Sequence, residues 1–338
     1  MENKPVKSKY TLGRFVLVYT VLLVALIVLI FIAVNVGSLK VGFIDLIKGL
    51  FIGNDSVVST IVDLRFPRIV ISLFAGAGLA VSGALFQAVL KNPLADPGII
   101  GISSGASFTA VIVSAVFPTL YFFTPIFAFF GGMLAFIIIY SLSYKGGLRP
   151  IRIILVGVAV NAMFTGLSSA LNSMTGGNLS GVASIVNGNI TMKTWDDVTT
   201  LLPYVIGGII LAIIFARSCN ILALSEQTAR GLGVDVEMLQ IIISLIAVLL
   251  ASICTAVVGT ISFIGLIVPH IGRIFVGSDY KRLIPFSIIL GAFTFLLADT
   301  LGRTIASPYE ISASIIMSVV GGPFFIWLLK HSEYGAKN

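Results

Sequence analysis

The stretch VVGTISFIGLIVPHIGRIFVGSDYKRLIP, residues 257–285, places a proline and a histidine inside an apolar run and follows them with a basic, turn-rich loop. Pro269 removes a backbone N–H donor and disturbs one helical turn. A lipid bilayer tolerates this only where neighbouring helices satisfy the freed carbonyl group. We therefore expect residues 260–276 to form a membrane helix that packs among other helices.

The composition of the whole chain supports this reading. Hydrophobic residues make up 57% of its 338 residues and charged residues only 10%, whereas soluble domains average about 25% charged residues. The net charge of +7 comes from Lys and Arg residues that lie between apolar segments, so it does not predict a nucleic-acid partner. Cys219 and Cys254 show no metal-ligand spacing. We expect an integral membrane protein without a metal or cofactor.

A membrane helix needs about 20 consecutive apolar residues, and the chain contains ten such segments. They are residues 15–36, 66–90, 98–118, 123–144, 152–172, 198–216, 238–258, 260–276, 284–303 and 309–329. The sequence therefore predicts an all-α polytopic membrane protein, with residues 1–338 forming a single transmembrane domain.

The distribution of basic residues predicts the orientation of these spans. With a cytoplasmic N-terminus, fifteen of the 21 Lys and Arg residues fall on the cytoplasmic side and six on the outside. Cytoplasmic loops carry an excess of Lys and Arg. We therefore expect both termini to lie in the cytoplasm and the protein to reside in the plasma membrane of a prokaryote.

The chain shows no energy source of its own. It lacks the GxxxxGK[ST] loop that cradles the phosphates of ATP. An ion-coupled secondary transporter, the rival class, places ionisable groups within the membrane, and Asp299 is the one deep candidate. Asp299 lies four residues before Arg303, so an ion pair within one helix is the simpler expectation. We predict a transport subunit that is not an enzyme and that receives its energy from a partner.

The cytoplasmic segment 217–237 is the predicted docking site for that partner. Ser225 is suited to cap a short helix, in which Glu226 and Arg230 are spaced i,i+4, and Gly231 and Gly233 are suited to end it. The candidate coupling residues are Ser225, Glu226, Gln227, Arg230, Gly231 and Gly233. The alternative is an amphipathic connector that lies on the bilayer surface, and spacing alone does not separate the two.

Three arginines lie on the predicted outer side, where basic residues are scarce. Arg65 and Arg68 flank Pro67 at the start of the second span, and Arg303 ends the ninth. Cations are disfavoured at a helix N-terminus, so an anionic partner is expected. The candidates are lipid phosphate, the neighbouring Asp63, or acidic residues of an extracytoplasmic binding protein.

Several polar or helix-breaking residues lie within the predicted spans. They are Gln87, Ser103, Ser104, Asn161, Pro269 and His270. Each is a candidate for lining a transport pathway or for packing between helices, and packing is favoured for the serines because small residues commonly form helix contacts in membranes. A lone histidine is more often structural than a metal ligand, so we predict no metal site at His270.

Six segments together resemble the FecCD-type permease family of ABC importers for iron-siderophores, haem and vitamin B12. They are RFPR at 65–68, SGALFQAVLKNPLADPGIIGISSGAS at 82–107, SEQTARGLG at 225–233, GTISFIGLIVPHIGR at 259–273, LLADTLGR at 296–303 and VGGPFFIWLL at 320–329. One departure is ISAS after Glu310, where many members have a proline and a glycine.

This resemblance implies a type II-like ABC importer permease of ten spans. Its partners would be a second permease, identical or paralogous, a cytoplasmic ATPase dimer, an extracytoplasmic substrate-binding protein and the surrounding lipid. The outer arginines look like those that meet glutamates of the binding protein, and SEQTARGLG looks like the segment that rests on the ATPase. The implied cargo is a ferric siderophore, with haem or vitamin B12 as alternatives.

Overall fold

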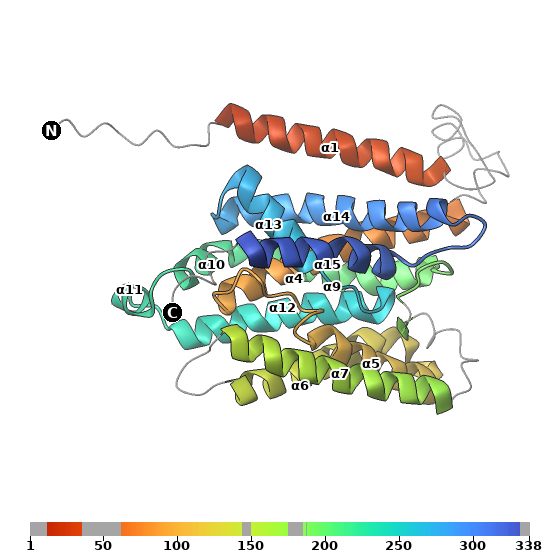
Figure 1. Cartoon of the computed structure of the whole chain (residues 1–338), viewed down its shortest axis with the longest axis horizontal. Helices are drawn as coiled ribbons and strands as arrows, with labels where there is room; N and C mark the ends of the chain where they lie inside the picture. The colour runs from red at the N-terminus through yellow and green to blue at the C-terminus, as the bar shows by residue number, and fades with distance from the viewer. Residues whose placement is uncertain (1–11, 36–61, 144–149, 175–184, 187, 332–338) are drawn as a thin grey trace.

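The computed structural model describes residues 12–35, 62–143, 150–174, 185–186 and 188–331. Within these residues the chain consists of helices and connecting turns, without any strand. The long helices run side by side along one common direction and form a single bundle (Figure 1). The prediction of an all-α polytopic fold is confirmed.

Eight helices in the described part of the chain are long and apolar enough to cross a membrane. They are α1 (Leu12–Asn35), α4 (Phe66–Val89), α6 (Thr124–Ser143), α7 (Pro150–Met174), α9 (Trp195–Ile214), α12 (Val236–Val258), α14 (Tyr280–Ile305) and α15 (Ala313–His331). Two further apolar helices, α5 (Ile102–Val116) and α13 (Ile264–Val276), have only 15 and 13 residues.

The structure corrects two predicted spans. The helix expected over 98–118 begins at Ile102, because Gly101 before it has a left-handed backbone with φ of 90°. The helix expected over 260–276 begins at Ile264, because Phe263 also adopts a left-handed backbone, with φ of 72°. At 1.5 Å per residue these helices are about 20–22 Å long, which is shorter than the roughly 30 Å hydrocarbon core. Both are therefore too short to cross this core alone, and they are called the half-length helices here.

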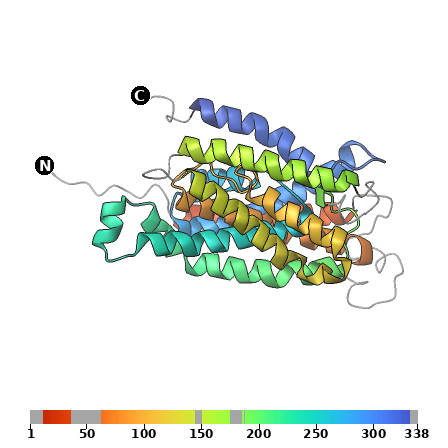
Figure 2. The ribbon, with the colours of Figure 1, turned by 90° about the horizontal axis from the view of Figure 1, so that it is seen from below.

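Helices α4 and α12 form the centre of the bundle, and nearly all of α4 is buried. Small residues allow this close packing: a methyl group placed on Gly76 would stand 2.3 Å from the carbonyl oxygen of Gly291 in α14. Ser82 of α4 donates a hydrogen bond of 2.6 Å to the carbonyl oxygen of Ala247 in α12. The apolar core therefore surrounds α4, and α1 and α15 lie at the edges of the bundle (Figures 1 and 2).

The two ends of the bundle differ. The predicted docking segment forms α10 (Ala216–Leu222) and α11 (Glu226–Gly231), which project from one end, called here the α11 end (Figures 1 and 2). Helix α1 begins at the α11 end, where Tyr19 donates a hydrogen bond to the carbonyl oxygen of Arg282. The short 3-10 helix η1 (Pro118–Phe123) joins α5 to α6 at the opposite end.

Candidate functional site

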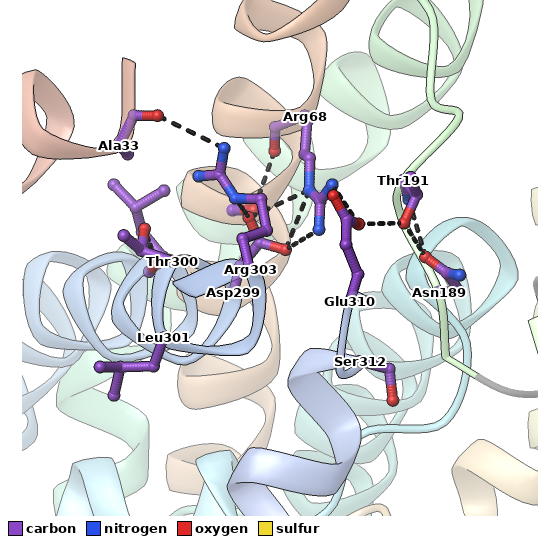
Figure 3. A network of polar contacts seen from close by, with 12 residues as sticks. Ala33, Arg68, Asn189, Thr191, Asp299, Thr300, Leu301, Arg303, Glu310 and Ser312 are labelled. Carbon is purple, nitrogen blue, oxygen red and sulfur yellow. Dashed lines mark hydrogen bonds and ion pairs between the residues drawn. The ribbon is translucent and has the colours of Figure 1, made fainter. Parts of the chain in front are cut away.

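Arg68 lies at the centre of a buried ionic network (Figure 3). Its position in the first turn of α4 places this network at the end of the bundle opposite α11. Its side chain, in the first turn of α4, is 8% exposed, and Asp299 of α14 is 1% exposed. The Arg68 Nε and Nη2 atoms donate hydrogen bonds of 3.0 and 2.8 Å to Asp299 Oδ1. Paired donors of this kind hold a carboxylate in a fixed orientation. The contact therefore ties α4 to α14.

Arg303 completes this network from the next turn of α14. Its Nε lies 3.3 Å from Asp299 Oδ2, without the hydrogen-bond alignment that Arg68 has. Its Nη1 donates a hydrogen bond of 3.4 Å to the carbonyl oxygen of Ala33 in α1. The ion pair that the i,i+4 spacing predicted is present, and Asp299 is therefore shared between two arginines.

Glu310, in the turn between α14 and α15, is the second acid of the network. Its Oε2 accepts hydrogen bonds of 2.9 Å from Arg68 Nη1 and 2.7 Å from Thr191 Oγ1. Burial alone would raise the pKa of the Glu310 carboxyl, but the hydrogen bond from Thr191 and the charge of Arg68 hold that pKa below its usual range. Glu310 thus links α4 to the segment before α9.

The structure brings the three predicted outer arginines to one end of the bundle, but in different environments. Arg68 and Arg303 are enclosed, with side chains 8% and 7% exposed. Arg65 is half-buried and donates a hydrogen bond to the carbonyl oxygen of Val34. Asp63 was a candidate partner, yet the carboxylates that Arg68 contacts are Asp299 and Glu310. Residue spacing gave no signal for the contact between Arg68 and Asp299, because 231 positions separate them.

At the α11 end, the predicted coupling segment forms the short capped helix. Ser225 Oγ accepts a hydrogen bond of 3.2 Å from the backbone N–H of Thr228, and Gly233 follows the helix with φ of 75°. Leu224 and Leu232 are exposed, whereas Ala229 is buried because it faces the chain's own core.

Two polar residues of α11 face solvent or a neighbouring turn. Gln227 is exposed, and Arg230 Nη2 lies 3.6 Å from Glu237 Oε1 as an exposed ion pair. Two exposed leucines, Leu224 and Leu232, therefore flank a short projecting helix that carries polar side chains.

Three hydrogen bonds of two residues that sequence reasoning missed, Asn220 and Lys91, fix this segment to the bundle. Asn220 of α10 donates a hydrogen bond of 2.7 Å to Asp279 Oδ1 and accepts one of 2.9 Å from the backbone N–H of Tyr280. Lys91, just after α4, donates a hydrogen bond of 2.9 Å to the carbonyl oxygen of Leu224. Burial would raise the pKa of Asp279, but the Asn220 amide and nearby cations lower it below its usual value. Movement of the segment must therefore act on α4 and α14.

The candidate pathway residues mostly pack between helices. Gln87, Ser103, Ser104 and Pro269 are buried. Ser104 Oγ donates a hydrogen bond of 2.8 Å to the carbonyl oxygen of Gly101.

Two candidates are only half-buried, namely Asn161 and His270. The His270 ring meets Phe324 edge-on with ring centres 5.6 Å apart. Among the described residues no group of three His, Cys, Asp or Glu side chains is placed to hold a metal ion. The contact with Phe324 gives His270 a packing environment between α13 and α15.

Known proteins are similar to this chain in sequence and in fold. The chain is 42% identical over 317 residues to the Staphylococcus aureus (strain MSSA476) protein described as "Probable heme-iron transport system permease protein IsdF", covering 94% of this chain and 96% of that protein. The protein of the same name from strain Newman is 41% identical over the same length.

Two solved structures share the fold at lower sequence identity. A metal-chelate type ABC transporter in an inward-facing conformation aligns with a TM-score of 0.77 and 24% identity, covering 94% of this chain and all of that one. PsaBC from Streptococcus pneumoniae, solved with a Fab, aligns with a TM-score of 0.57 and 18% identity, covering 85% of this chain and 95% of that one. The model of the FecCD transport family matches residues 25–331. The chain is therefore a member of the FecCD transport family, the permease subunits of ABC importers.

Proposed function

We propose that this chain is the membrane-spanning subunit of a haem importer in the bacterial plasma membrane. The observation that carries the proposal is the 42% identity to a haem-iron permease over 94% of this chain. The family resemblance implies a ferric siderophore as the commonest cargo, and the relatives favour the haem alternative. ATP hydrolysis is expected in a separate subunit, because permeases of this family are not themselves ATPases.

We assign the α11 end to the cytoplasm. The charge bias of the sequence supports this orientation, since it predicts fifteen of the 21 Lys and Arg residues on the cytoplasmic side, together with segment 217–237. A cytoplasmic ATPase would then bury Leu224 and Leu232, which are 40% and 62% exposed. The coupling role belongs to Ser225 and its neighbours through Gly233. A second permease subunit would complete the transport pathway.

At the opposite end we assign a docking role to Arg65, Arg68 and Arg303, and we expect Arg65 to act differently from the other two. Arg65 is the most accessible of the three, so it is the residue that an acidic group of a binding protein would meet first. Arg68 and Arg303 already share Asp299, so we expect them to shape the docking surface and to contribute to its positive field.

The paired state of Asp299 also weighs against the secondary-carrier alternative. A proton carrier needs a carboxyl group that gains and loses its proton during each cycle. Arg68 and Arg303 both contact Asp299, so its carboxylate is already held by two side chains. A carrier role would require Asp299 to leave this buried network at every turnover.

The test is uptake of radio-iron haem, a panel of ferric siderophores and cobalamin by cells with and without this chain. Selective loss of haem uptake supports the proposal. Loss of siderophore or cobalamin uptake with intact haem uptake overturns the assigned cargo. In proteoliposomes, cargo movement by this chain without any ATPase subunit would overturn the assigned energy source.

A further inference from the structure

The two half-length helices both begin inside the bundle. Helix α4 ends near the α11 end, where Lys91 contacts Leu224, and α5 runs from Ile102 to η1 at the opposite end. Helix α12 ends at the opposite end, and α13 runs back from Ile264 to the turn that holds Asp279 near Asn220. Because each half-helix is about 20–22 Å long, its N-terminus lies well inside the membrane-spanning part.

The segments before these two helices touch each other. A methyl group placed on Gly98 would stand 2.9 Å from the carbonyl oxygen of Ile261. One placed on Gly265 would stand 2.9 Å from Asp96 Oδ2 and 3.0 Å from Pro97 Cδ. Residues 96–98 and 261–265 therefore form one packed junction between the start of α5 and the start of α13.

Asp96 is the charged residue of this junction, and it is 1% exposed. Its Oδ1 accepts hydrogen bonds of 2.9 Å from the Gly98 N–H and 3.0 Å from the Ile99 N–H, in the turn that leads into α5. Its Oδ2 lies beside the first turn of α13, close to Gly265, and has no hydrogen-bond partner among the described residues. Helix N-termini expose unpaired N–H groups and attract negative charge. One carboxylate thus binds the turn before α5 and packs beside the start of α13.

A second side chain connects the same two segments. Gln87 of α4 donates from Nε2 to the carbonyl oxygen of Ala95 at 3.3 Å and to that of Gly265 at 3.1 Å. On its other side the junction packs on α7, because a methyl group placed on Gly101 would stand 2.9 Å from the backbone nitrogen of Asn161. The junction is therefore held by α4 and α7 as well as by its own carboxylate.

We propose that Asp96 is a positioning residue for transport, which holds the starts of α5 and α13 together so that the two half-helices move as one unit. The cytoplasmic segment contacts both of their connections, through Lys91 before α5 and through Asn220 beside the turn that follows α13. Displacement of α11 by an ATPase therefore moves both half-helices, and Asp96 keeps their interior ends at a fixed position relative to each other. The proposal rests on the permease function.

The experiment compares Asp96→Ala and Asp96→Asn with the wild type in the complete importer, purified with its ATPase. Asp196→Asn is the matched control, because Asp196 is an exposed carboxylate in the first turn of the continuous helix α9. Hydrogen–deuterium exchange measures the amides of residues 98–104 and 264–268. In proteoliposomes, haem moved per ATP hydrolysed measures coupling.

For Asp96→Ala we expect exchange at these amides to rise at least tenfold, with little change in α9 and α12, and haem moved per ATP to fall at least tenfold. Asp96→Asn keeps one carbonyl acceptor for Gly98 and Ile99, so its values should lie between Asp96→Ala and the wild type. Asp196→Asn should match the wild type.

Unchanged exchange at the junction, an equal rise along every helix, or an unchanged ratio of haem to ATP in Asp96→Ala would each overturn the proposal. Failure of the wild-type importer to move haem would count against the proposed cargo instead. In that case the exchange comparison, together with ATP hydrolysis stimulated by the binding protein, still decides the role of Asp96.

Discussion

Replacing Asp299 by asparagine should destabilise this protein strongly, because it leaves two buried guanidinium groups short of negative charge. Asparagine keeps the shape of the side chain and one carbonyl acceptor, so packing changes little. Arg68 retains its contact of 2.9 Å with Glu310, whereas Arg303 retains a 3.4 Å hydrogen bond to the carbonyl oxygen of Ala33. Removing one partner from a buried ion pair costs about 3–5 kcal/mol.

We therefore expect Asp299→Asn to lower the free energy of unfolding by about 3–5 kcal/mol. The measurement is denaturant unfolding of the purified permease in detergent micelles. Glu310→Gln is the matched control, because the Glu310 side chain is 36% exposed, and partly exposed ion pairs contribute only about 0–1 kcal/mol. The loss in free energy of unfolding should thus be several-fold larger for Asp299→Asn than for Glu310→Gln.

Equal stability of Asp299→Asn and the wild type would refute the view that this network is structural. A cost for Glu310→Gln as large as that for Asp299→Asn would refute the ranking by burial. A third result would revive the carrier alternative: a fully stable Asp299→Asn permease whose partner still hydrolyses ATP but which no longer moves cargo. Asp299 would then act in proton transfer.

Three further predictions concern other parts of the chain. Gly83→Ala should abolish folded protein in membranes, because the added methyl group would stand 2.1–2.4 Å from backbone atoms of Gly265. The control Gly166→Ala should express normally, because there is open space around Gly166. Ser225→Ala removes a helix cap worth about 1 kcal/mol, so the dissociation constant of the ATPase should rise about fivefold in a binding titration; no change would remove α11 from the interface. Folding lowers the pKa of Glu310, so the stabilisation by its carboxylate should be complete above the unfolded pKa and disappear as the pH falls through the folded pKa. In unfolding curves measured over this pH range, the wild type should therefore lose more stability than Glu310→Gln as the pH falls.

Local features of the sequence were sufficient for the protein class and for the docking helix. Apolar runs of helical length identify membrane spans wherever they occur, because the bilayer sets the length. The cap of α11 was equally predictable, since Ser225 and Thr228 lie within one turn. The ion pair between Asp299 and Arg303 followed from i,i+4 spacing on one helix.

The half-length helices were not predictable from hydropathy. Residues 98–101 and 260–263 are as apolar as the helices they precede, and what sets the start of each helix is a left-handed backbone at Gly101 and Phe263. The signal that was present is chemical: an Asp-Pro-Gly turn at residues 96–98 leads into α5. Its carboxylate has a role only because another half-helix begins beside it.

The sequence by itself determined that this chain crosses a membrane repeatedly, which segment projects from one end, and to which family it belongs. Those properties depend on composition and on neighbours within a few helical turns. Tertiary structure alone decided that Arg68 contacts Asp299, 231 residues away, and that Asp96 lies between two interrupted helices. The physical reason is that a buried charge is stabilised by whichever group the folded chain brings within about 3 Å, and residue spacing does not encode that distance.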